Sequence, residues 1–141
     1  MIKKIKTSFN NQTFMKTIGA KLGKNKSGYC EIILPFSKNF SQQHGLVHGG
    51  VISILADNAC AFAAFSLMKE PFQPLTIELK INFLSQSFCH KLIAKGFVLR
   101  AGKLITHAKS EIFSVFEKKE TLIAFSTATI KSSKSIKKLK I

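Results

Sequence analysis

The stretch Gln42–Ala64, QQHGLVHGGVISILADNACAFAA, decides how this 141-residue chain folds. Gly49 and Gly50 allow the backbone to turn tightly. The twenty residues that begin at Gly49 are apolar on nearly all sides, and Asp57 is the one charged side chain among them. Such a run predicts a helix over 50–68 that is buried in a core, with the prolines that follow ending it.

The same stretch has a second interpretation as a membrane span. Five of its twenty residues are alanines, so its hydrophobicity is modest. A central Asp57 costs about 2.5–3.5 kcal/mol on membrane-insertion scales. The basic N-terminus also lacks the apolar run of a secretory signal. We therefore expect no membrane span and a cytoplasmic location.

Strand-like segments surround the predicted helix. Residues 17–22 and 29–35 flank a glycine-containing turn, which predicts a hairpin. Residues 75–83 alternate apolar and polar side chains without a break, so we expect Leu75 and Ile77 to face the core and Thr76 to lie in the polar row. Further strands are expected at 91–100, 104–116 and 121–131, which completes a meander of four strands. One antiparallel sheet of about six strands would then cover the helix.

The composition limits the domain organisation and the function. We expect one domain over residues 1–131, followed by a tail over 132–141 that is rich in lysine and serine. The chain has 22 basic and 7 acidic residues, but it has no nucleic-acid-binding motif, so we expect no specific nucleic-acid partner. Three cysteines without paired spacing predict neither a disulfide framework nor a metal site, and no cofactor is expected.

With these elements in order, the sequence resembles the hotdog-fold acyl-CoA thioesterases, in particular the group related to the phenylacetate-pathway thioesterase. The matching features are Gly45 three residues before His48-Gly49-Gly50, and Leu55-Ala56-Asp57, whose acid lies nine residues beyond the histidine. The resemblance implies an α+β hotdog fold, in which an antiparallel sheet of about six strands wraps around one long central helix. It also implies hydrolysis of acyl-CoA to a carboxylic acid and free coenzyme A.

The chemistry of that reaction can be compared with the residues present. Thioester hydrolysis needs N–H donors aimed at the carbonyl oxygen and a carboxylate that attacks the carbon or activates water. Gly49 and Gly50 at the start of a helix have amides without an intrahelical partner, so they are suitable oxyanion donors. Asp57 is the only carboxylate between Glu31 and Glu70. It is the candidate nucleophile or general base.

The spacing of these groups leads to a prediction about assembly. At a rise of about 1.5 Å per residue, Gly50 and Asp57 lie about 10 Å apart along one helix. Both groups must act on one carbonyl. Two copies paired about a two-fold axis with antiparallel helices would place Gly50 of one copy against Asp57 of the other. The resemblance likewise implies homodimers, or dimers of dimers.

The remaining roles come from the resemblance. It implies that His48 shapes the donor loop and that Thr76 approaches Asp57 to position water. Gln42 stands where the family often has Asn, as a substrate-binding residue with a longer side chain. Further candidate substrate-binding residues lie on the helix and on the turn over residues 100–103, where coenzyme A phosphates would bind, namely Asn58, Phe62, Arg100 and Lys103.

Each of these interpretations has a structural alternative. Asp57 is also compatible with a buried ion pair, the glycine pair with a simple tight turn, and Phe62 with ordinary core packing. Because Gln42 departs from the family pattern, a non-catalytic hotdog scaffold that binds acyl thioesters is the alternative to an enzyme.

Overall fold

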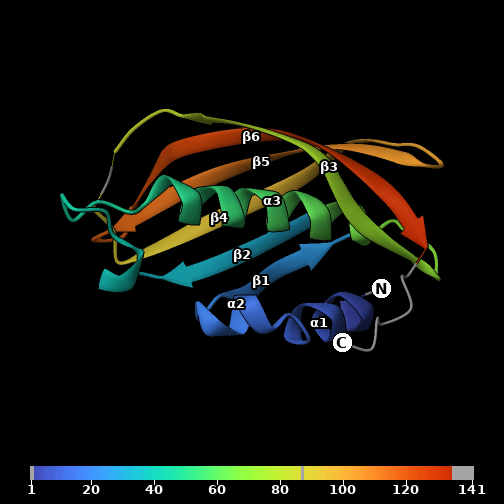
Figure 1. Ribbon diagram of the computed structural model, residues 1–141, viewed down its shortest axis with the longest axis horizontal. Coiled ribbons are helices and arrows are strands. Elements are labelled where there is room, and N and C mark those ends of the chain that lie inside the picture. Colours follow the sequence, from blue (N-terminus) through green and yellow to red (C-terminus); the bar gives the residue numbers. More distant parts are fainter. Residues whose placement is uncertain (1, 87, 135–141) are drawn as a thin grey trace.

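The computed structural model describes residues 2–86 and 88–134 (Figure 1). Two short helices, α1 and α2, precede a β-hairpin, a single 3-10 turn and one long helix, α3, after which four strands follow. In chain order the elements are α1 (Ile2–Asn10), α2 (Thr13–Thr17), β1 (Lys21–Lys26), β2 (Tyr29–Pro35), η1 (Lys38–Phe40), α3 (Gly49–Phe65), β3 (Phe72–Phe83), β4 (Lys91–Ala101), β5 (Ile105–Phe116) and β6 (Lys119–Lys134).

The strands form one antiparallel sheet of six strands in the order β1-β2-β4-β5-β6-β3. Figure 1 shows the sheet curving around α3, with α1 and α2 beside β1. The predicted fold class is therefore confirmed. The prediction of a four-strand meander is wrong for β3, which pairs with β6 at the edge of the sheet. The connection over residues 84–90 instead carries the chain to β4, which pairs with β2.

The core lies between α3 and the concave face of the sheet. Leu55, Ala56 and Ala59 of the helix are fully buried against inward-facing strand residues. Gly96 of β4 brings the two layers into backbone contact, because a Cβ atom there would lie 2.1 Å from the carbonyl oxygen of Ala59. The alanines of α3 thus allow a close approach of helix and sheet, as expected for a small-residue helix face.

Several element boundaries differ from the sequence prediction. The first strand spans Lys21–Lys26, because α2 takes up Thr13–Thr17 and the chain then turns at Gly19, which has a φ of +75°. Helix α3 ends at Phe65, three residues before the predicted end. Strand β6 continues to Lys134, into the segment that we expected to be a tail. The rest of that tail, residues 135–141, lies outside the described residues.

A β-bulge in β3 reverses part of the predicted alternation. The pairing with β6 shifts register between Thr76 and Glu78, so Ile77 is the extra residue. Thr76 is paired with the buried Ile130, which places Thr76 on the side of the sheet that faces α3. Ile77 is 55% exposed. The prediction that Thr76 lies in the polar row opposite the core is therefore wrong.

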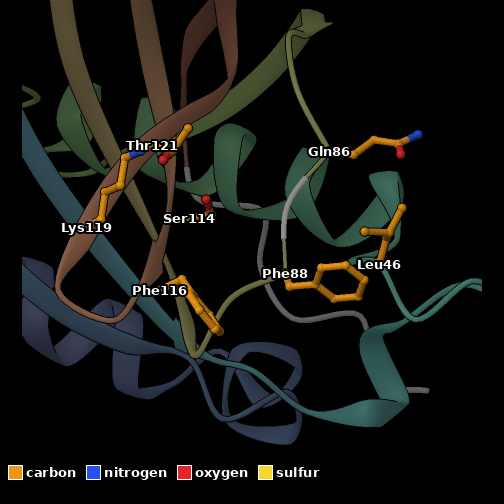
Figure 2. A pocket seen from close by; sticks show the side chains of 7 residues that line it. All are labelled: Leu46, Gln86, Phe88, Ser114, Phe116, Lys119 and Thr121. Carbon is orange, nitrogen blue, oxygen red and sulfur yellow. The ribbon is translucent and has the colours of Figure 1, made fainter.

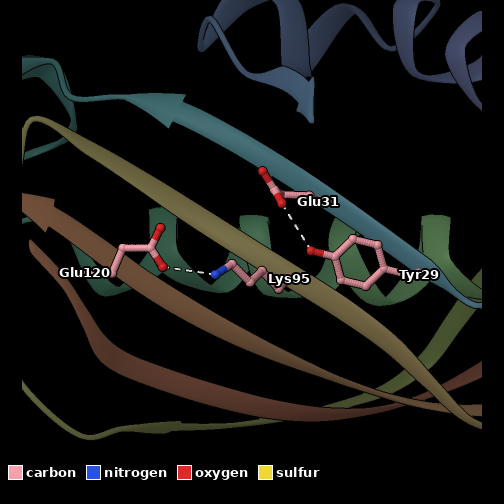
Figure 3. A network of polar contacts seen from close by, with 4 residues as sticks. All are labelled: Tyr29, Glu31, Lys95 and Glu120. Atoms are coloured by element: carbon pink, nitrogen blue, oxygen red, sulfur yellow. Dashed lines mark hydrogen bonds and ion pairs between the residues drawn. The ribbon is translucent and has the colours of Figure 1, made fainter. Parts of the chain in front are cut away.

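The convex face of the sheet is covered by a mixture of aromatic and charged side chains (Figure 3). The Tyr29 hydroxyl donates a hydrogen bond to Glu31 at 3.1 Å, and burial is the main reason that the pKa of Tyr29 rises to about 12. Lys95 pairs with Glu120 at 3.0 Å and lies 4.3 Å from the centre of the Phe113 ring. These contacts link aromatic and charged side chains of neighbouring strands on this face.

Candidate active site at the central helix

The loop before α3 is held in place by its own backbone. The Gln42 amide donates to the Leu46 carbonyl at 2.8 Å, and the Gly45 amide donates back to Gln42 at 2.9 Å. Gly45 has a φ of +77°, a conformation that glycine adopts without strain. The His48 amide donates to the Phe40 carbonyl at 2.7 Å. The start of α3 is therefore fixed relative to the loop.

His48 is the N-cap of α3, and its side chain engages one of the two expected donor amides. The Gly50 N–H donates to His48 Nδ1 at 2.9 Å, so this nitrogen is unprotonated in that hydrogen bond. Within the described part of the chain, the Gly49 amide donates no hydrogen bond. Phe83 packs over Gly49, since its ring would lie 3.3 Å from a Cβ atom at that position. Gly49 therefore presents the unpaired amide.

Asp57 lies in the middle of α3, half-buried, at the wall of a cavity of about 660 Å³. Its Oδ1 atom is buried and, in residues 2–86 and 88–134, accepts no hydrogen bond. A buried carboxylate oxygen without a partner is costly, about 1–3 kcal/mol or more. This oxygen is therefore available to accept a hydrogen bond from a group that enters the cavity.

Three further predicted site residues line the same cavity. Thr76 reaches it because of the β3 bulge, and Asn58 and Phe62 come from α3. Asn58 Nδ2 donates to the Ile54 carbonyl at 3.0 Å. Phe62 is 3% exposed and packs edge-on against Phe9, with ring centres 5.5 Å apart, so most of its surface belongs to the core.

The other predicted site residues lie elsewhere. Gln42 is in the loop before α3, and Arg100 is exposed near the end of β4. Lys103, in the β4–β5 turn, lines a separate cavity of about 390 Å³ beside Met68. Gly49 and Gly50 begin the helix, about 10 Å along its axis from Asp57. One protomer therefore does not bring the donor amides and the carboxylate together.

The sequence analysis missed the contribution of α1 and α2 to the Asp57 cavity. Ser8 of α1, Thr13 and Phe14 of α2, and Gln12 between the two helices line it, together with residues at the start of β3. Phe14 is 54% exposed. No motif in the sequence marks these residues, because their place at the cavity depends on how α1 and α2 pack.

A second cavity, of about 530 Å³, lies beside the loop before α3. Figure 2 shows Leu46 and Phe88 on one side, and Phe116, Lys119 and Thr121 of the β5–β6 hairpin on the other. The Phe116 ring stacks on His90 with centres 4.8 Å apart. This cavity contains none of the predicted catalytic side chains.

The described residues contain neither a membrane-spanning helix nor a cluster of metal ligands. No described helix is long and apolar enough to cross a membrane. Across residues 2–86 and 88–134, no group of three or more His, Cys, Asp or Glu side chains is placed to hold a metal ion. The cavity at Asp57 thus offers a carboxylate, a hydroxyl and an amide as its polar groups near α3.

A sheet curved around one helix, with a carboxylate in mid-helix and a glycine pair at its start, defines a hotdog-type protein. The family model of the thioesterase superfamily matches residues 44–118, which include both features. The chain belongs to the thioesterase superfamily.

Solved structures of other proteins are similar to this chain. The structure of a thioesterase family protein from Silicibacter pomeroyi is 34% identical, with a TM-score of 0.92 over 95% of this chain and 98% of that one. The PaaI protein of the E. coli phenylacetic acid degradation operon shares the fold, at 20% identity and a TM-score of 0.83 over 93% of this chain and 91% of that one.

Curated relatives match over a shorter length. A Saccharolobus solfataricus protein named as an esterase is 29% identical over 90 residues, which are 64% of this chain and 64% of that protein. A second protein from this organism, also named as an esterase, is 36% identical over 67 residues, 48% of this chain and 44% of that protein. The match thus spans less than two thirds of either relative.

Proposed function

We propose that the chain is a thioesterase that hydrolyses acyl-CoA to a carboxylic acid and free coenzyme A, with Asp57 as the catalytic carboxylate. The observation that carries this proposal is the buried Asp57 Oδ1 atom, which has no hydrogen-bond partner in the described chain and lies beside a cavity. A carboxylate kept unpaired at a cavity is available to a substrate carbonyl or a water molecule.

The reaction needs one water molecule and no redox partner. Asp57 either takes a proton from water, which then adds to the thioester carbon, or attacks that carbon itself and forms an anhydride that water opens. In both routes the C–S bond breaks and the thiolate of coenzyme A receives a proton. Thr76, which lines the same cavity, is the proposed water-positioning residue. The two routes share Asp57 and differ in the covalent intermediate.

The donor amides are proposed to come from a second copy of the chain. Gly49 has the unpaired amide, while the Gly50 amide is held by His48, so we assign Gly49 as the main oxyanion donor and His48 as the residue that orients the loop. Amides at a helix N-terminus also carry the positive end of the helix dipole. Because Gly49 and Asp57 are eight residues apart on α3, a donor near Asp57 has to be supplied by another protomer.

The edge of the sheet supports this pairing. In the described chain, strand β3 has β6 as its partner on one side and no strand on the other. Its Leu75 and Ile77 side chains are exposed, and Leu75 lines the Asp57 cavity. A long edge strand with exposed apolar side chains is a ready surface for another strand. A homodimer formed there, or a dimer of such dimers, would bring two α3 helices together in antiparallel orientation.

The remaining proposed contacts are those to coenzyme A and to the thioester group. Arg100 and Lys103 are proposed to contact coenzyme A phosphates, and Gln42 is proposed to contact the thioester from the donor loop of the second copy. Cys30, Cys60 and Cys89 are free and buried. Free thiols suit a reducing compartment, so the proposed location is the cytoplasm.

One observation favours the alternative of a non-catalytic scaffold that binds acyl thioesters. The hydrogen bond from the Gly50 amide to His48 removes one of the two expected oxyanion donors. An enzyme then relies on the Gly49 amide, whereas a scaffold needs neither amide for turnover. The two functions therefore differ in their dependence on the Gly49 N–H.

The test replaces that single N–H. Proline fits the first position of a helix, and His48 already has the extended backbone, with ψ of 134°, that a residue before proline prefers. Gly49→Pro therefore removes the N–H, and Gly49→Ala adds a similar contact with Phe83 but keeps the N–H. Release of free thiol is measured on acetyl-, butyryl-, dodecanoyl- and phenylacetyl-CoA.

We expect Gly49→Pro to lower kcat about 100-fold and Gly49→Ala to change it by less than a factor of about five. Equal effects of the two substitutions would contradict the donor role of Gly49. Tight acyl-CoA binding without thiol release from any of the four compounds would support the scaffold.

A further inference from the structure

The Asp57 cavity continues into a neighbouring cavity along α1. This α1 cavity, also about 660 Å³, reaches Lys3, Lys4 and Glu70. Ser8, Gln12 and Gln73 line both cavities. The two cavities therefore form one groove between the α1–α2 segment and the start of β3.

The floor of this groove follows one face of α3. The first part of the groove is lined by Asn58, Ala61 and Phe62, and the second part by Phe65. The last three residues follow Asn58 by three, four and seven positions. Residues at this spacing share one side of a helix. From Asp57 to Phe65 the groove covers about 12 Å of the helix axis. Ala61 is half-buried, and its small side chain leaves the space open one turn beyond Asp57.

The polarity of the groove changes along its length. Near Asp57 the lining includes the apolar Ala61, Phe14 and Pro74 beside the polar Thr13, Asn58 and Thr76, and Phe14 is 54% exposed. Gln12 and Gln73 line both cavities and therefore lie at the junction between them. Gln12 precedes α2, and its side chain makes no capping hydrogen bond.

The far end of the groove is charged. Lys4 Nζ donates to the Met68 carbonyl at 2.6 Å and lies 4.2 Å from the centre of the Phe65 ring, which covers the aromatic surface there. Lys3 and Glu70 line the same end. An aliphatic chain that extended this far would remove water from amide and ammonium groups without offering them hydrogen bonds.

We propose that this groove holds the acyl group of the substrate, and that α1 and α2 select short acyl groups over long aliphatic ones. This inference rests on the proposed thioesterase function. The apolar part of the groove extends about 6 Å from Asp57 to Ala61 along the helix. Gln12 and Gln73 mark its end and act as specificity-determining residues, and Phe14 forms the wall of the apolar part.

The test changes the junction and measures acyl preference. We expect kcat/KM of the wild type for butyryl-CoA to exceed that for dodecanoyl-CoA. The Gln12→Leu/Gln73→Leu double variant extends the apolar lining, and we expect it to shift the ratio of the two values at least tenfold toward dodecanoyl-CoA. Lys6→Leu on the exposed face of α1 adds the same side chain outside the groove and leaves the ratio unchanged. A shift in the double variant smaller than twofold would overturn the inference.

A second substitution tests the floor. Ala61→Met fills the groove one turn beyond Asp57, so we expect it to lower kcat/KM for butyryl-CoA about tenfold while acetyl-CoA turnover changes by less than threefold. Thermal unfolding midpoints of all variants are compared with that of the wild type to verify folding. A loss that is equal for acetyl and butyryl groups would contradict an acyl site at Ala61.

A binding measurement separates this inference from the proposed function. Butyrate and dodecanoate are titrated calorimetrically into the wild type and the double variant, because the free acids report on the groove without any turnover. Absence of thioester hydrolysis, with dodecanoate binding at least tenfold tighter to the double variant, contradicts the enzyme and supports the acyl groove. Hydrolysis by the wild type, with an unchanged preference in the double variant, supports the enzyme and contradicts the groove.

Discussion

The two edges of the six-stranded sheet differ in length and in the side chains that they expose. Strand β1 is six residues long, exposes Lys21, Lys24 and Lys26, and lies beside α1 and α2. Strand β3 is twelve residues long and exposes Leu75 and Ile77. Short, lysine-rich edges resist strand pairing, whereas long apolar edges favour it. The site residues Asp57 and Thr76 lie beside the β3 edge, so the proposed association and the proposed chemistry share one side of the molecule.

The largest expected effect comes from removing the carboxylate on the β3 side. Asp57→Ala is expected to lower kcat for thiol release at least about 1,000-fold, because it removes the attacking or proton-accepting group. Its size in solution and its unfolding midpoint should match the wild type. Asn58→Ala, which changes the neighbouring residue in the same cavity, serves as the comparison and should retain far more activity. Wild-type activity in Asp57→Ala would remove the basis of the mechanism.

A charge on the helix face beside β3 should break the association. If Gly49 of one copy faces Asp57 of the other, the two-fold axis passes close to Ser53 and its neighbour Ile54. Ile54 is half-buried in the protomer, and an unpaired lysine in a buried contact costs about 3 kcal/mol or more, which weakens a dimer about 100-fold. Ile54→Lys should therefore be a monomer with little activity.

Light scattering coupled to size exclusion measures the mass of this variant at micromolar concentration. Leu104→Lys, at an exposed site 58% accessible in the β4–β5 turn, should remain a dimer. A dimeric, fully active Ile54→Lys would show that the copies pair by another surface.

A smaller effect is expected at the bulge in β3. Thr76→Val keeps the shape of the side chain and removes the hydroxyl that we propose to position water, so kcat should fall about tenfold. Thr76→Ser keeps a hydroxyl and should recover most of the activity. Initial rates on the preferred acyl-CoA give the comparison. If Val and Ser variants behave alike, Thr76 contributes packing and no water contact.

The smallest effect is a decrease in folding stability at alkaline pH, and it involves Cys30 in β2 and Cys60 in α3. Burial, followed by the charge of Glu31, raises the pKa of the Cys30 thiol in β2 from 9.0 to about 12. Burial likewise raises the pKa of Cys60 to about 11, partly offset by hydrogen bonds from Ser126 and Ser110. In the unfolded chain these thiols ionise first, so the folded state loses stability as pH rises from about 9 toward 12.

Urea unfolding at pH 8, 9, 10 and 11 measures this loss. A Cys30→Ala/Cys60→Ala variant provides the control, since it titrates every other group but lacks the two thiols. The difference in unfolding free energy between wild type and variant should shrink as pH rises. A difference that is constant over this range would mean that the thiols ionise alike in both states.

The sequence predicted the central features of the fold for identifiable physical reasons. The apolar run after Gly49 predicts a helix buried in a core, the strand-like segments around it predict the sheet that covers it, and the nine-residue spacing from His48 to Asp57 carried the family resemblance. The unbroken alternation over 75–83 gave a correct strand. The same alternation gave the wrong face for Thr76, because a bulge depends on pairing with β6 and leaves no mark in the strand itself.

Two parts of the site could not be predicted from the sequence. The His48–Gly50 hydrogen bond depends on the rotamer of the N-cap side chain. From the sequence alone, a glycine pair is equally compatible with two free amides. The cavity wall formed by Gln12 and Phe14 depends on how α1 and α2 pack beside β3, which local patterns do not determine.

The most direct test of the two-copy site mixes two inactive variants. Asp57→Ala lacks the carboxylate and Gly49→Pro lacks the donor N–H, so each homodimer has no complete site. After the two are unfolded and refolded together, half of the dimers are mixed, and each mixed dimer has one complete site of two, which predicts about a quarter of wild-type activity. Activity no higher than the sum of the separate variants would contradict a site shared between two copies.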